Sequence, residues 1–177
     1  LSIQNSKLTA LDIDIKTQNF IANQTDLTAT QSIALNTESV SITNNSELLS
    51  TNIIINSSSI NDADNTFGVK NSKITALDTA KLSITDDVII DEDDVFTNTN
   101  NLELTLNSLE NRSVLSVKNN LIITSDTHIS NSQYLSAANT LTLSATGNIV
   151  NNAGLDSSKK EGIQASVVNL TSDSSII

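Results

Sequence analysis

The densest charge in the sequence is an acidic run in its centre, made of Asp86-Asp87 and Asp91-Glu92-Asp93-Asp94. Clustered carboxylates can hold Ca²⁺, which prefers a shell of many oxygen ligands. The spacing fits neither an EF-hand loop nor the glycine-rich calcium nonapeptide. A solvated corner that discourages lateral aggregation is therefore the favoured interpretation. Calcium binding is the alternative, with the candidate ligands Asp86, Asp87, Asp91, Asp93 and Asp94.

Asp126, His128 and Ser130 are the residue types of a nucleophilic triad. On a strand all three side chains point outward beside Ile129, because successive side chains alternate between faces. Residues i and i+2 then lie about 6.5–7 Å apart, which is beyond the ~3 Å over which a base activates a nucleophile. The pattern predicts no triad, and His128 is interpreted as an ordinary surface residue.

The four aromatic residues are expected to divide between core and surface. Phe20, Phe67 and Phe96 fall at strand positions and are predicted to fill the core. Tyr134 combines an apolar ring with a polar hydroxyl group, and we expect it on the surface as a contact residue.

Composition excludes several classes of function. The chain of 177 residues carries a formal net charge of -11, so the phosphate backbone of nucleic acid and anionic membranes would be repelled. It has no Cys, and therefore no disulfide, thiolate metal site or cysteine nucleophile. Its apolar runs, such as Ile53-Ile54-Ile55, are far too short to span a bilayer. The chain begins at Leu1, contains no Met and has no stretch typical of a signal peptide, so we expect a piece of a longer protein.

Short clusters of β-branched residues and Leu recur about every 6–7 residues and predict strands. Within a cluster the apolar residues alternate with polar ones, as in Leu102-Glu103-Leu104-Thr105-Leu106. This alternation indicates that one side of each strand is buried and the other is exposed to solvent.

Asn, Asp, Ser and Thr separate the clusters, and only 4 Gly and no Pro are present. Antiparallel hairpins favour Asn-Gly, Asp-Gly or Gly-Gly turns, none of which occurs here. Corners that bend the chain without reversing it suit Asn and Asp, which adopt left-handed conformations more readily than other non-glycine residues. The expected fold is therefore all-β: a single-stranded right-handed parallel β-helix, or β-solenoid, with about 20 residues per three-sided coil. The whole chain, residues 1–177, would form one such domain of about eight to nine coils.

A segment that occurs twice in the sequence supports this repetition. The phrase Asn5-Ser6-Lys7-Leu8-Thr9-Ala10-Leu11-Asp12 returns as Asn71-Ser72-Lys73-Ile74-Thr75-Ala76-Leu77-Asp78. An offset of three coils of about 22 residues would keep both copies on one face.

The stretch Ala138 to Leu155, which reads ANTLTLSATGNIVNNAGL, resembles the repeats of the filamentous haemagglutinin family, the large exoproteins of two-partner secretion. The resemblance implies a parallel β-helix rod exported through an outer-membrane transporter of a Gram-negative cell. It also implies a role in adhesion, or as the stalk of a contact-dependent toxin. This chain has fewer Gly than that family, and we expect a segment from the middle of such a rod, without the N-terminal secretion domain of the family.

We therefore expect a secreted, surface-displayed fibrous adhesin segment that makes many weak contacts with a host or neighbouring cell, with an unidentified glycan or protein as the ligand. The alternatives are a passive stalk or a fibre subunit that stacks end to end. A β-helix enzyme acting on polysaccharide is less favoured, because it would need paired carboxylates with a basic residue and stacking aromatics, and Arg112 is the only Arg. No catalytic residue, cofactor, nucleic acid or membrane span is expected.

Overall fold

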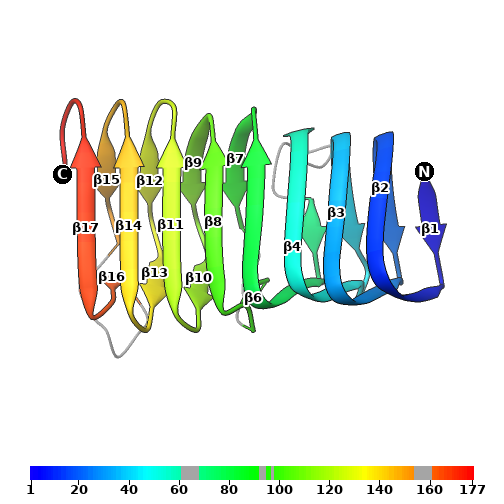
Figure 1. The fold of residues 1–177 in the computed structure, drawn as a ribbon. Coiled ribbons are helices and arrows are strands. Elements are labelled where there is room, and N and C mark those ends of the chain that lie inside the picture. The colour runs from blue at the N-terminus through cyan, green and yellow to red at the C-terminus, as the bar shows by residue number, and fades with distance from the viewer. Residues whose placement is uncertain (61–67, 92–94, 97, 154–160) are drawn as a thin grey trace.

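The computed structural model describes residues 1–60, 68–91, 95, 96, 98–153 and 161–177. In these residues every strand pairing is parallel. The strands follow one another along a rod with the N-terminus at one end and the C-terminus at the other (Figure 1). The expected all-β solenoid is confirmed.

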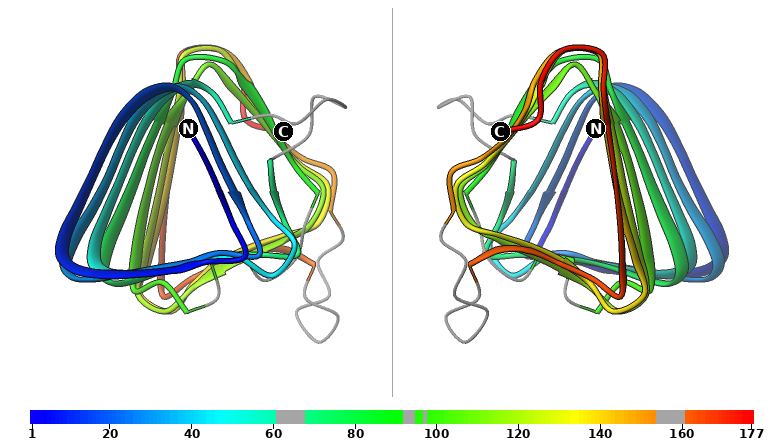
Figure 2. Two further views of the ribbon diagram at one scale, coloured as in Figure 1. Left: turned by 90° about the vertical axis from the view of Figure 1, so that its right-hand side faces the viewer. Right: turned by 90° about the vertical axis from the view of Figure 1, so that its left-hand side faces the viewer.

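Three sheets form the sides of the rod, which is triangular when viewed along its axis (Figure 2). The largest sheet contains β1 (Ser2–Gln4), β2 (Lys7–Asn23), β3 (Asp26–Thr43), β4 (Glu47–Ser59), β6 (Lys73–Ile84), β8 (Asn101–Leu106), β11 (Asn120–Ser125), β14 (Thr140–Ala145) and β17 (Val167–Ser172), with β5 (Val69–Lys70) paired to β3. A second contains β7 (Asp87–Ile90), β9 (Ser108–Asn111), β12 (Ile129–Asn131) and β15 (Ile149–Asn151), and a third contains β10 (Val114–Val117), β13 (Tyr134–Ala137) and β16 (Gly162–Gln164).

We name the sides by their C-terminal strands. Face 1 carries β8, β11, β14 and β17 together with the parts of β2, β3, β4 and β6 that pair in line with them. Face 2 carries β7, β9, β12 and β15, and face 3 carries β10, β13 and β16. In the N-terminal half the long strands bend at the corners and continue from one face to the next (Figure 2).

Coil length follows from the register on face 1. Leu104 pairs with Ile123, and Ile123 pairs with Leu143, so each of these steps takes about 20 residues. About seven turns separate β2 from β17, fewer than the eight to nine expected. Two coils are longer than the rest, because the paired positions 55 and 82, and likewise 143 and 170, are 27 residues apart.

The two copies of the repeated segment, at residues 5–12 and 71–78, occupy equivalent positions in the fold. Lys7 pairs with Asp26, Asp26 pairs with Glu47, and Glu47 pairs with Lys73. The two copies of the phrase therefore lie in one column three coils apart, as the sequence predicts. Corner lengths differ between coils, since the register shifts after Ala10 and again after Ser50.

Inward-pointing side chains of similar type stack on one another in successive coils and form the core. On face 1 one such column is almost wholly aliphatic and is buried in seven successive coils, through Ile13, Ile33, Ile53, Ala80, Leu102, Leu121 and Leu141. Phe20 and Phe96 are buried as predicted, whereas Phe67 lies outside the described residues. Burying each of these large side chains stabilises the fold by about 1.5–3 kcal/mol, which is how a chain poor in aromatics can fold.

The corners use the predicted left-handed conformations. Positive φ angles occur in the described residues outside glycine at Asn5, Gln24, Asn44, Asn45 and Asn71. Each of these corners is followed in the chain by a Ser or Thr residue, and these residues lie above one another in successive coils. The Thr25 backbone N–H donates to Ser46 Oγ at 3.0 Å, and the Ser46 N–H donates to Ser72 Oγ at 3.1 Å. These buried hydroxyl groups satisfy backbone groups that the bend removes from the sheet.

Candidate binding surfaces

The described part of the acidic run lies within a single coil, with Asp86 and Asp87 at the start of β7 and Asp91 just after its end. Asp87 Oδ1 accepts hydrogen bonds from Asn107 Nδ2 at 2.8 Å and from Ser108 Oγ at 2.6 Å, and Asp86 Oδ1 caps the backbone N–H of Asp87. Asp93 and Asp94 lie outside the described residues. In the described part of the chain, no three acidic or histidine side chains come together as a metal site. Calcium binding therefore remains a prediction without a described ligand set.

Asp126, His128 and Ser130 do not assemble into a catalytic unit. Asp126 and His128 are exposed, and His128 Nδ1 lies 3.3 Å from the hydroxyl oxygen of its neighbour Thr127. Ile129, which lies between His128 and Ser130, is fully buried, and this is the alternation expected from the sequence.

An ion pair on face 2 contains the most clearly perturbed groups. Arg112 Nε and Nη2 donate to the two carboxylate oxygens of Glu110 at 2.7 and 2.9 Å. This bidentate hydrogen bond lowers the pKa of Glu110 and raises that of Arg112. Both side chains are substantially exposed, so solvent screens the attraction between them. The geometry indicates a surface salt bridge rather than a catalytic centre.

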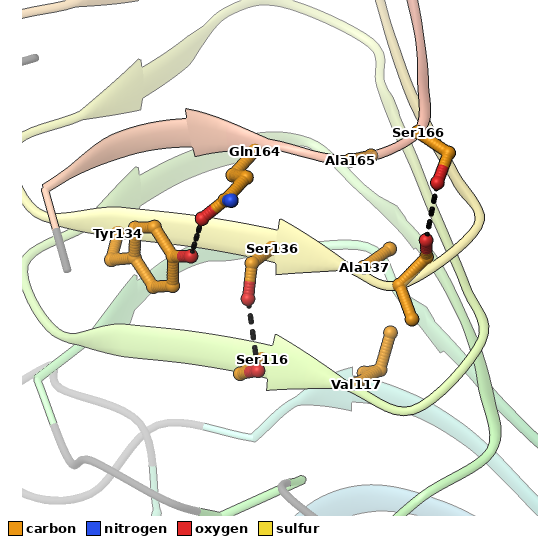
Figure 3. Close-up of a pocket in the computed structure, with 9 residues that line it drawn as sticks. Ser116, Val117, Tyr134, Ser136, Ala137, Gln164, Ala165 and Ser166 are labelled. Carbon is orange, nitrogen blue, oxygen red and sulfur yellow. Dashed lines mark hydrogen bonds between the residues drawn. The ribbon is translucent and has the colours of Figure 1, made fainter. Parts of the chain in front are cut away.

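A groove of about 380 Å³ lies on face 3, between β10, β13 and the segment that follows β16 (Figure 3). Serine hydroxyls line its floor, where Ser136 Oγ donates to Ser116 Oγ at 2.9 Å. The Tyr134 hydroxyl group hydrogen-bonds to the side-chain oxygen of Gln164 on the next strand.

Tyr134 is not the surface residue that we expected, because only 8% of it is exposed. It stands opposite Gly162 in the sheet, where the absence of a side chain leaves room for the ring. Gly162 has a φ of 88°, a left-handed conformation that favours glycine. Tyr134 therefore closes the outer side of the sheet rather than projecting from it.

A second groove, also of about 380 Å³, crosses four coils on face 1, and we call it the four-coil groove. It runs between two columns of outward side chains that alternate with the buried core residues. Its lining comprises Thr79 of β6, Asn101, Leu102 and Glu103 of β8, Asn120 and Ile122 of β11, and Thr140 and Thr142 of β14.

Corner amides hold one wall of this groove in place. Asn101 Oδ1 accepts hydrogen bonds from Asn119 Nδ2 at 2.9 Å and from Asn120 Nδ2 at 2.8 Å. Asn139 Nδ2 donates to Asn120 Oδ1 at 3.2 Å, and Asn101 Nδ2 donates to the Asp78 carbonyl oxygen at 3.0 Å. An amide NH₂ group has two hydrogens, so the wall amides retain donor capacity toward the groove while their planes are fixed.

Hydroxyl and amide residues also form a continuous outward column on the other side of face 1. From β6 to β17 its five members are small hydroxyl residues, namely Ser83, Thr105, Thr124, Ser144 and Thr171. Sequence reasoning found the strands but neither this column nor the groove. The missing signal was a pairing of positions about 20 residues apart, which becomes visible only once the register is known.

Comparison with protein-family profiles, with curated proteins and with solved structures yields no match for this chain. Among the described residues, no helix has the length and apolar character needed to cross a membrane. Together these results show a parallel β-solenoid with repeated polar columns and shallow grooves on its sides.

Proposed function

We propose that this chain is a structural and binding segment of a secreted, surface-displayed fibrous adhesin. The observation that carries this proposal is the outward column of face 1, where five consecutive coils present a small hydroxyl side chain. Strands in such a stack are about 4.8 Å apart, so a rigid rod offers the same weak contact many times over. Summed contacts of this kind give avidity without any single deep site.

The resemblance of residues 138–155 to filamentous haemagglutinin repeats supports the same proposal. It implies export from a Gram-negative cell by an outer-membrane transporter, and a host or neighbouring cell surface as the partner. We propose no catalytic role and no cofactor for this segment.

The proposal is tested by coating beads with the purified chain at increasing density and counting beads bound to epithelial and bacterial cells. The test variant carries Thr105→Asp, Thr124→Asp and Ser144→Asp on face 1. A matched control carries three substitutions of outward residues outside this column: Ser41→Asp on β3, Ser130→Asp on β12 and Asn148→Asp just before β15. We expect binding to rise steeply with density and to fall at least tenfold in the face 1 variant alone. Absence of cell binding at every density, or equal binding by all three proteins, would overturn the proposal.

A fibre subunit that stacks end to end is the second candidate, and the inward residues of β17 are where a further coil would pack. The inward-pointing residues Val168 and Leu170 are 42% and 37% exposed, whereas Leu141 and Leu143 beneath them are fully buried. An apolar strand edge of this kind can pair with another strand. A second copy of the chain could cover it by placing the first coil of one rod on the last coil of another.

A further inference from the structure

The four-coil groove carries almost no net charge. Glu103 is the one ionisable residue in its lining, and Lys81 Nζ on the neighbouring coil pairs with Glu103 Oε2 at 2.7 Å. The chain as a whole is acidic, with a formal net charge of -11, and therefore repels anions. The acidic chain therefore disfavours an anionic ligand, and the paired Glu103 leaves no free charge in the groove lining to hold an ionic one.

The two walls of the groove differ in chemistry. One wall presents the Asn101 and Asn120 amides between the hydroxyl groups of Thr79 and Thr140. The hydroxyl groups of Thr79 and Thr140 make no hydrogen bond within the described part of the protein, so they are available to a ligand. The other wall contains Ile122, an isoleucine that is 38% exposed.

This pairing of walls suits a sugar ring. A pyranose has hydroxyl groups around its edge and apolar C–H groups on its faces, so it can satisfy polar donors while covering an apolar side chain. Sites of this kind combine apolar contact with a few placed polar groups. Because the corner amides already fix the wall, binding would cost little side-chain entropy.

The spacing of the groove also selects the shape of the ligand. Its polar groups repeat along the rod at the distance between neighbouring strands, about 4.8 Å. In an extended β-1,4-linked glycan each ring advances the chain by a similar length. We propose that the four-coil groove binds an uncharged, extended β-1,4-linked glycan that lies along the rod axis, with one sugar ring per coil. This inference rests on the proposed adhesin function and names the ligand class for one of its surfaces.

The substitution that tests the groove is Ile122→Asp, which places a charge at its centre. Ile54→Asp is a matched control, since Ile54 lies in the same outward column, is 39% exposed and is not part of the groove. The probes are cellohexaose and chitohexaose, with hexagalacturonate as the anionic comparison. Binding is measured by calorimetry and by shifts in amide NMR signals.

We expect at least one neutral hexamer to bind, with shifts at Asn120 and Thr140, and hexagalacturonate not to bind. Affinity should rise with oligomer length up to about four rings, one per coil. Ile122→Asp should weaken binding at least tenfold, while Ile54→Asp leaves it unchanged and both variants retain the wild-type circular dichroism.

The inference is overturned if neither neutral hexamer binds, or if both variants bind as the wild type does. In another outcome, the face 1 column variant loses cell binding while Ile122→Asp binds cells as the wild type does. That result would reject the groove as the glycan-binding site and leave the adhesin proposal intact. Absence of cell binding by the wild type, with cellohexaose still bound at the groove, would reject the adhesin proposal instead.

Discussion

Asn111 Nδ2 donates a hydrogen bond of 2.7 Å to Oδ1 of Asn131, one coil further along the rod. Asn131 repeats the contact with Asn151, also at 2.7 Å. Asn111 and Asn131 are buried, and their side chains also donate to backbone carbonyl oxygens of the corner. This ladder of amides lies at the corner where the chain passes from face 2 to face 3.

Removing the middle of this ladder should destabilise the rod. Asn131→Ala leaves the Asn111 donor and the Asn151 acceptor without their partner, so we expect a loss of about 2–3 kcal/mol in the free energy of unfolding. Asn152→Ala, at the exposed neighbouring position, should change it by less than about 0.5 kcal/mol. Urea denaturation measures both, and equal midpoints would show that the ladder contributes nothing.

The ladder ends at Ile90, which pairs with Asn111 from the preceding coil. Asn111 Oδ1 is buried and has no hydrogen-bond partner, because an isoleucine stands where another amide would donate to it. Ile90→Asn supplies that donor, whereas Ile55→Asn places an amide in a fully buried aliphatic column. We expect Ile90→Asn to cost at least about 1 kcal/mol less than Ile55→Asn in thermal or urea unfolding. A larger cost for Ile90→Asn would contradict this account.

The left-handed corners should tolerate glycine and reject β-branched residues. Asn71 has a φ of 47°, and such a conformation costs about 1–2 kcal/mol for an ordinary side chain. Asn71→Val should therefore lower the free energy of unfolding by about that amount, while Asn71→Gly should not lower it. Asn56→Val, on an exposed strand position, serves as the control and should cost less, because it removes only an exposed hydrogen bond to Asn36. The prediction fails if valine is as well accepted at 71 as at 56.

The Glu110–Arg112 pair should give a small pH-dependent contribution to stability. Its hydrogen bonds lower the pKa of Glu110 in the folded state, so the contribution is present above the ordinary glutamate pKa of 4.5 and is lost as the pH falls through the lower folded value. Melting temperatures of the wild type and Glu110→Gln should differ slightly at pH 7 and converge as the solution is acidified below the folded pKa of Glu110. Added salt should reduce the difference at pH 7. A difference that grows on acidification would give the opposite sign and reject the assignment.

End-to-end stacking depends on the apolar edge of β17. Leu170→Lys places a charge on an inward position and should suppress association, whereas Asn169→Lys changes the adjacent outward position and should not. Sedimentation velocity over a concentration series measures association, and electron microscopy shows whether the product is filamentous. A wild-type chain that stays monomeric at every concentration argues for the stalk or adhesin rather than the fibre.

Much of the fold could be predicted from local sequence. Alternation in Leu102 to Leu106 assigns inward and outward residues, because side chains on a strand point to opposite sides in turn. Asn71 marks a corner, because few other non-glycine residues adopt a positive φ at low cost. The repeated phrase at positions 5 and 71 then sets the stacking of like coils.

The binding surfaces and the polar interior depended on the tertiary structure. Asn111 is buried although its side chain is polar, and Asn131 on the next coil accepts a hydrogen bond from its amide. Tyr134 is buried opposite Gly162, which is 28 positions away in the chain, and its hydroxyl group bonds to Gln164. The four-coil groove likewise needs Thr79 and Thr140 in one column.

The composition and period of the sequence thus determine a parallel solenoid, since alternation and corner conformation are local properties of a few adjacent residues. Which side chains meet between coils is decided by the length of every corner along the path. Because those corners differ in length, the register, and with it the grooves and ladders, emerges only when the coils are stacked.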